Sequence, residues 1–145
     1  MIVSALAASA LAAALALSAC GGSSSKNGDV IAGISYIDGA GLHEMNEEIV
    51  NTGKIPGDAH TVAVRLQAVT LLTDWPGDLD AQAKALAALF GEMAKALDTD
   101  ALDLKRVEET TTKAHDGWHD FSHEVWDYLA KEAKVTGADD AHGHD

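Results

Sequence analysis

Cysteine, proline and positive charge are all scarce in this 145-residue chain. Cys20 is the only cysteine, and Pro56 and Pro76 are the only prolines. A single cysteine leaves no cysteine pair for covalent haem attachment. Ten basic residues face 23 acidic ones, and the resulting net charge of −13 repels phosphate backbones and anionic lipid headgroups. We therefore expect no nucleic-acid partner.

Sequence motifs for common enzyme chemistry are missing as well. There is no Gly-rich phosphate loop and no sequence context for a Ser-His-Asp triad. Nothing marks a general acid or base apart from residues that could ligate a metal. The expected role is therefore binding rather than catalysis.

The N-terminal stretch is apolar and rich in small residues, and it ends at Leu17-Ser18-Ala19-Cys20. It resembles the signal peptide and lipobox of a bacterial lipoprotein, although no Lys or Arg precedes Lys26 to form the usual basic start. The resemblance implies cleavage before Cys20, a lipid on its sulfur, and an extracytoplasmic chain anchored to a bacterial membrane on the periplasmic or cell-surface side. The alternative is an N-terminal membrane helix, since about 18 apolar residues reach the lower limit of spanning length.

Composition divides the chain into four parts. A Gly/Ser-rich stretch typical of flexible coil follows the cysteine, and an acidic stretch with two histidines ends the chain. We expect a signal peptide at 1–19, a flexible tether at 20–28, a folded domain at 29–135 and a disordered acidic/His tail at 136–145.

Apolar residues recur at helical spacing through the folded domain, without the sustained alternation of a half-buried strand. Pro56-Gly57-Asp58 and Pro76-Gly77-Asp78 each predict a turn followed by an aspartate that caps the next helix. The predicted helices are 30–52, 58–74, 78–97 and 101–134. The predicted fold is all-α, an antiparallel up-down-up-down four-helix bundle with a long fourth helix of about 50 Å.

Candidate core residues follow steps of three and four along these helices. They are Ile34, Ile37, Gly41, Met45 and Ile49; Val64, Ala68, Leu71 and Leu72, with Val62, Leu66 and Val69 on a second side; Leu79, Ala83, Leu86, Phe90, Met93 and Leu97; and Leu104, Val107, Thr111, Ala114, Trp118, Phe121, Val125 and Leu129.

The histidines are the candidate functional residues of the domain. His115, His119 and His123 lie at successive i, i+4 steps, and His43 and Glu47 have the same spacing. In a bundle the first and fourth helices are neighbours, so the two sets can converge. A conflict remains, because His43 lies about 200° around the helix from the Met45 face, so the first helix would have to bury a different face.

We therefore predict a site for a transition metal ion (Zn, Cu, Ni or Fe), used for capture or sensing. The predicted ligands are His43, Glu47, His115 and His119, with His60 and His123 as possible further ligands and Asp116 and Asp120 orienting the imidazoles.

Alternatives stay open. The histidines can instead be surface residues that cover Trp118 and Trp126, in a non-catalytic structural or adaptor lipoprotein that binds another envelope protein. Haem held by Met45 and a histidine is less favoured, because no wide run of small residues makes room for a porphyrin. His142 and His144 in the tail can bind metal only loosely. The His-x-x-x-Glu and His-x-x-x-His spacings resemble parts of the hemerythrin pattern, but the remainder is missing, so no residue roles are carried over.

Overall fold

The computed structural model describes residues 26–98 and 102–135, which form helices and no β-strand. This confirms the predicted all-helical class. The helices are α1 (Lys26–Asp38), α2 (Leu42–Thr52), α3 (Ala59–Leu72), α4 (Leu79–Leu97) and α5 (Leu104–Glu132). Within these residues, no helix combines the length and the apolar character that crossing a membrane requires. The predicted signal peptide, Cys20 and the 136–145 tail lie outside the described residues.

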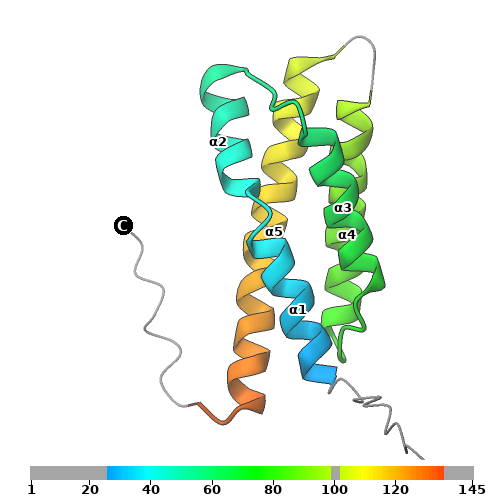
Figure 1. Cartoon of the computed structure of the whole chain (residues 1–145), viewed down its shortest axis with the longest axis vertical. Coiled ribbons are helices and arrows are strands. Elements are labelled where there is room, and N and C mark those ends of the chain that lie inside the picture. The colour runs from blue at the N-terminus through cyan, green and yellow to red at the C-terminus, as the bar shows by residue number, and fades with distance from the viewer. Residues whose placement is uncertain (1–25, 99–101, 136–145) are drawn as a thin grey trace, which may run out of the picture.

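The helices pack side by side as a bundle with four members (Figure 1). The first member is α1 followed by α2, which lie one above the other beside α5. The pairs in contact are α3 with α4, α4 with α5, α5 with both α1 and α2, and α1 with α3. Residues at the two ends of the domain sequence, on α2 and α5, are thereby brought together.

The single helix predicted over 30–52 is wrong: it is broken between α1 and α2. Gly41 has φ 74°, a left-handed conformation that interrupts a helix and that glycine adopts without strain. The backbone N–H of Ala40 donates to the carbonyl of Ile37 and closes the end of α1. Because α1 begins at Lys26, its first three residues also belong to the stretch predicted as tether.

A turn forms at each Pro-Gly-Asp segment, but the aspartate is the third residue of that turn and does not follow it as a cap. The backbone N–H groups of Ala59 and Leu79 donate to the carbonyls of Pro56 and Pro76, each at 3.1 Å. Neither Asp58 nor Asp78 accepts a side-chain capping bond from a described residue. A main-chain turn therefore starts each helix in place of the predicted side-chain cap.

The start of the final helix also differs from the prediction. A side-chain cap occurs at Asp103, whose Oδ1 accepts from the backbone N–H of Arg106 at 3.3 Å. The helix thus begins at Leu104 and not near residue 101.

The core is centred on α4. Among the described residues, Phe90 and Met93 are completely buried, as are Leu66 on α3 and Val107 on α5. The core prediction is wrong for a set of residues that are exposed instead: Val64, Ala68, Leu71 and Leu72 on α3 and Leu104 at the start of α5. Trp75, in the turn after α3, donates its indole N–H to the carbonyl of Thr70 at 2.7 Å and packs edge-on against Phe121. Apolar packing of this kind holds α5 in a fixed register, and that register sets the height of its histidines.

Candidate metal centre

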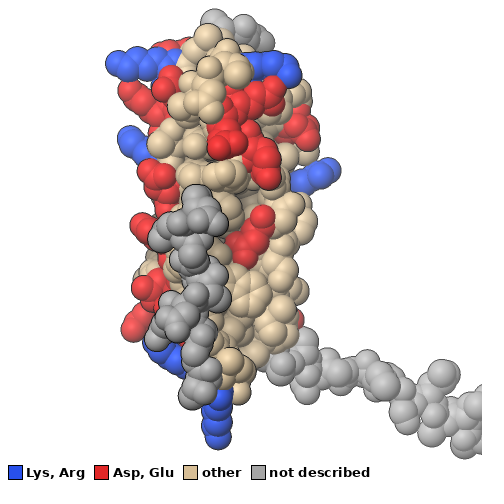
Figure 2. Space-filling view, turned by 90° about the vertical axis from the view of Figure 1, so that its left-hand side faces the viewer, with Lys and Arg blue, Asp and Glu red and all other residues tan. Residues whose placement is uncertain are grey.

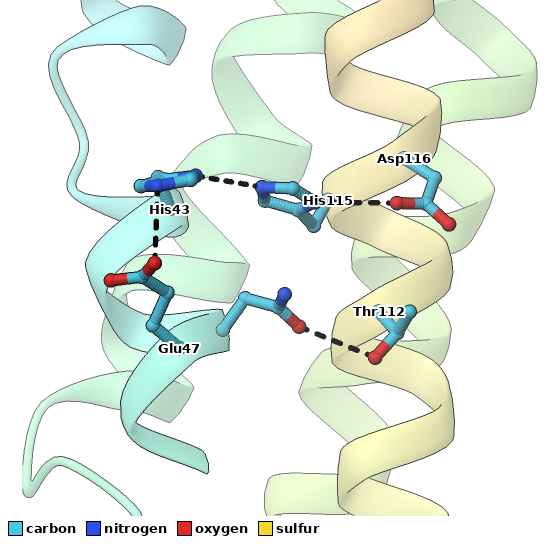
Figure 3. A network of polar contacts seen from close by, with 6 residues as sticks. His43, Glu47, Thr112, His115 and Asp116 are labelled. Atoms are coloured by element: carbon cyan, nitrogen blue, oxygen red, sulfur yellow. Dashed lines mark hydrogen bonds and ion pairs between the residues drawn. The ribbon is translucent and has the colours of Figure 1, made fainter. Parts of the chain in front are cut away.

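Three histidines converge where α2 crosses α5 (Figure 3 shows two of them). His43 Nδ1 on α2 and His115 Nε2 on α5 lie 3.0 Å apart. With His119, one turn along α5, each residue offers a ring nitrogen, and these three atoms lie within 4.8 Å of one another. Nitrogens bound to one tetrahedral ion lie about 3 to 4 Å apart, so small side-chain movements would suit the cluster to a single ion.

The break before α2 explains how this helix serves both the core and the cluster. Leu42, Met45 and Ile49 are buried against the bundle. His43 lies on the neighbouring flank, with its side chain 52% exposed, and reaches across to His115. The expectation that a different face would have to be buried was therefore wrong: Met45 is buried and His43 still meets α5.

A second polar contact follows the same seam one turn further along. Asn46 Oδ1 on α2 accepts from Thr112 Oγ1 on α5 at 3.3 Å (Figure 3). Thr112 precedes His115 by three residues, so it lies on the same flank of α5. The two helices are thus joined along one edge by polar side chains and along the next by apolar ones.

Each of the two facing imidazoles has a carboxylate on its other nitrogen (Figure 3). Glu47 Oε1 lies 3.6 Å from His43 Nε2, and Asp116 Oδ1 lies 3.3 Å from His115 Nδ1. Glu47 does not belong to the group of three convergent ligands. Its position is that of a group that orients His43, as Asp116 orients His115.

His119 is half-buried and packs beside Trp118. Its ring centroid lies 4.6 Å from that of His115, 6.2 Å from that of His43 and 4.4 Å from that of Trp118. Partial burial lowers the pKa of His119, the nearby His115, His43 and His123 lower it further, and Asp116 opposes them. The neutral imidazole, which is the form that binds metal, is thereby favoured.

A carboxylate that sequence reasoning missed holds this part of α5 in place. Asp38, the last residue of α1, accepts hydrogen bonds from Trp118 Nε1 at 2.8 Å, from Ser122 Oγ at 2.9 Å and from Trp126 Nε1 at 2.9 Å. The three donors are four residues apart, so they form one stripe on α5. The four-residue spacing of these donors could have indicated a shared acceptor. Asp38 fixes the indole of Trp118, which packs against His115 and His119.

The remaining predicted residues lie away from the three nitrogens. His60 is exposed and lines a groove with residues of α4, on the other side of the bundle. His123 and Asp120 are exposed further along α5. Cys20, His142 and His144 lie outside the described residues.

Comparison of the chain with protein families, with curated proteins and with solved structures finds no match. Function must therefore be argued from the site itself.

Proposed function

We propose that this protein captures or senses a single transition metal ion through His43, His115 and His119. The observation that carries the proposal is the convergence of three imidazole nitrogens, within 4.8 Å, from residues on two different helices. Imidazole ligands suit Zn, Cu, Ni and Fe rather than Ca or Mg. Because His43 is half exposed, the remaining coordination positions would face water.

The hydrogen bonds of the facing pair are compatible with an ion. Two contacts lie within hydrogen-bond distance, from His43 Nδ1 to His115 Nε2 at 3.0 Å and from His115 Nδ1 to Asp116 Oδ1 at 3.3 Å. Two neutral imidazoles carry the two N–H donors that these contacts use. An ion in place of the His43 to His115 hydrogen bond would leave the His43 proton on Nε2, which faces Glu47 at 3.6 Å. Ligand histidines must be deprotonated, so protons and metal would compete for the site.

We further infer that the domain is an extracytoplasmic lipoprotein, anchored to a bacterial membrane by a lipid on Cys20. The lipobox resemblance supports this, and the lone cysteine agrees with it. For the bundle we infer an antiparallel up-down-up-down order with α1 and α2 as its first member and α5 as its long fourth. Short connections between helices that contact each other support that order.

One observation favours the rival role, a non-catalytic adaptor that binds another envelope protein. The histidines are partly satisfied without metal, since His43 and His115 hydrogen-bond to each other and His119 packs against Trp118. A cluster of this kind can serve simply as a polar edge between two helices.

Metal titration separates the two roles. The full chain should carry His142→Ala and His144→Ala, so that tail histidines contribute nothing. With Zn²⁺, Cu²⁺ or Ni²⁺ at 100 times Kd, native-state binding raises the free energy of unfolding by about 2.7 kcal/mol. We expect a raised melting temperature, and with Cu²⁺ a loss of fluorescence from Trp118, whose ring centroid lies 4.4 Å from that of His119.

The matched controls use histidines of the same chain. The double variant His115→Ala, His119→Ala should lose the metal-dependent shift, whereas His60→Ala and His123→Ala should keep it. Glu47→Gln and Asp116→Asn should each weaken binding by about 10- to 100-fold, as expected for groups that orient a ligand. A chain that shows no shift with any of the metals would favour the adaptor role.

A further inference from the structure

Exposed leucines lie at both ends of the bundle, and the most exposed pair lies at the lower end. At the opposite end, Leu102 and Leu104 are 46% and 54% exposed. At the lower end in Figure 1, where α1 begins and α3 ends, Leu72 is 85% exposed and Leu71 57% exposed. Beside them a groove of about 410 Å³ runs between α1 and α3, with Ala32, Tyr36 and Val69 among its lining residues. Single exposed leucines are common on soluble proteins, whereas contiguous exposed apolar surface often marks a contact site.

The turn after α3 is held close to α1, so these leucines have a fixed place. A Cβ added at Gly33 of α1 would lie 2.6 Å from Thr73 Oγ1, which shows how tightly the helix and the turn approach. Thr73 in turn donates its hydroxyl to the carbonyl of Val69 at 2.9 Å. Leu72 therefore projects from a packed junction beside the first turns of α1.

Charge is distributed unevenly along the bundle. Figure 2 shows acidic side chains over the upper half of one face and along its left edge, and basic side chains at the top, the sides and the bottom, while the lower right of that face is largely uncharged. Lys131 and Lys134 are at the end of α5, which is the same lower end in Figure 1. Asp29 and Asp74 line the groove, so the end is not uniformly basic. A zwitterionic lipid surface suits this mixture better than an anionic one.

We propose that this leucine-bearing end docks on the lipid surface of the membrane that holds the anchor. The proposal rests on the lipidation of Cys20 in the proposed function. Only six residue steps separate Cys20 from Lys26, and an extended chain covers at most about 3.6 Å per step. The start of α1 therefore stays within roughly 20 Å of the lipid.

This orientation also places the metal centre. His115 precedes the end of α5 by 17 residues, which corresponds to about 25 Å along a helix axis. With the leucine end on the lipid, the three histidines face the aqueous compartment, where ions and partner proteins can reach them.

A fluorescent probe at residue 72 tests the proposal. In the lipidated mature chain, Leu72→Cys carries the only free thiol, because the sulfur of Cys20 is occupied. A polarity-sensitive fluorophore is attached there, and the protein is placed in phosphatidylcholine vesicles with or without spin-labelled lipid. We expect emission at shorter wavelength and quenching by the spin-labelled lipid. Leu104→Cys, 54% exposed at the opposite end, is the matched control and should show neither effect.

Three results would overturn the proposal. If the probes at 72 and 104 both emit as they do in water and neither is quenched by the spin-labelled lipid, the leucine end does not contact lipid. A blue-shifted probe at 72 without vesicles, with a doubled molecular mass by light scattering, means that a second copy covers the leucines. A chain that stays soluble with a titratable Cys20 thiol removes the anchor itself. Metal binding, measured separately, is unaffected by any of these results.

Discussion

Helices α4 and α2 are held in the same bundle by different means. Helix α4 buries nine residues, including Phe90 and Met93, on several sides of its axis. Helix α2 buries only Leu42, Met45 and Ile49, and its next flank meets α5 through His43 and Asn46. Helix α4 is fixed by apolar packing over a wide face, whereas α2 is fixed along a narrow one.

This difference shows how a small bundle can carry a binding site without weakening its core. A hydrogen bond contributes about 0.5 to 1.5 kcal/mol net, whereas a large buried side chain contributes several kcal/mol when cavity costs are included. The histidine edge can therefore be altered with little loss of fold, while α4 cannot.

The largest expected effect is in the core of α4. Phe90 is completely buried, so Phe90→Ala should lower the free energy of unfolding by about 3 to 5 kcal/mol. Denaturant unfolding followed by circular dichroism measures this. A loss below about 1 kcal/mol would mean that α4 is not the packed centre of the bundle.

The next largest loss of stability is expected at Asp38, which joins the end of α1 to α5. Asp38→Ala leaves the indole N–H of the buried Trp118 without its acceptor, which should cost about 1 to 3 kcal/mol. Asp38→Asn keeps one acceptor oxygen and should cost less. Equal stability of both variants and the wild type in thermal melts would contradict the role assigned to this carboxylate.

Replacing the buried hydroxyl of Thr111 should raise the free energy of unfolding, unlike the two substitutions above. Thr111 is fully buried, and its Oγ1 has no hydrogen-bond partner among the described residues. Thr111→Val removes that atom at similar volume and should raise stability by about 1 kcal/mol. Thr110→Val, in which the replaced hydroxyl does bond to a carbonyl, is the matched control and should not stabilise. Stabilisation by both would point to β-branched packing as the cause.

The smallest effect is the pH dependence of the metal-free cluster. The pKa of His119 is lowered in the folded state, so the unfolded state binds more protons as pH falls. This contribution is fully present above the ordinary histidine pKa of about 6.5 and is lost as pH falls through the lowered value. Melting temperatures should therefore fall more between pH 7 and pH 5 in the wild type than in His119→Gln. Parallel profiles would show that His119 is not the responsible group.

Much of the bundle could be predicted from periodicity. The stripe through Ala83, Leu86, Phe90 and Met93 is buried as expected, because steps of three and four residues place side chains on one face of a helix. The break in the helix before α2 could not be predicted from the sequence in the same way. Gly39 and Gly41 disfavour a helix by only about 1 kcal/mol each, which tertiary packing can override.

The histidine pairing was predictable from spacing, and the role of Glu47 was not. Steps of four residues placed His43 with Glu47 and His115 with His119 on their flanks, but which nitrogen faces which group depends on side-chain rotamers. The role of Asp38 was not predicted, because its three donors are far away in the sequence. Only the contact between α1 and α5 brings them together.

Equilibrium dialysis against limiting Zn²⁺ tests the central claim most directly, using the full chain with His142→Ala and His144→Ala. We expect one ion per chain, and loss of that ion when His43, His115 or His119 alone is replaced by alanine. No bound ion, or one ion retained in all three variants, would contradict the assignment of the α2 and α5 histidines as a metal centre.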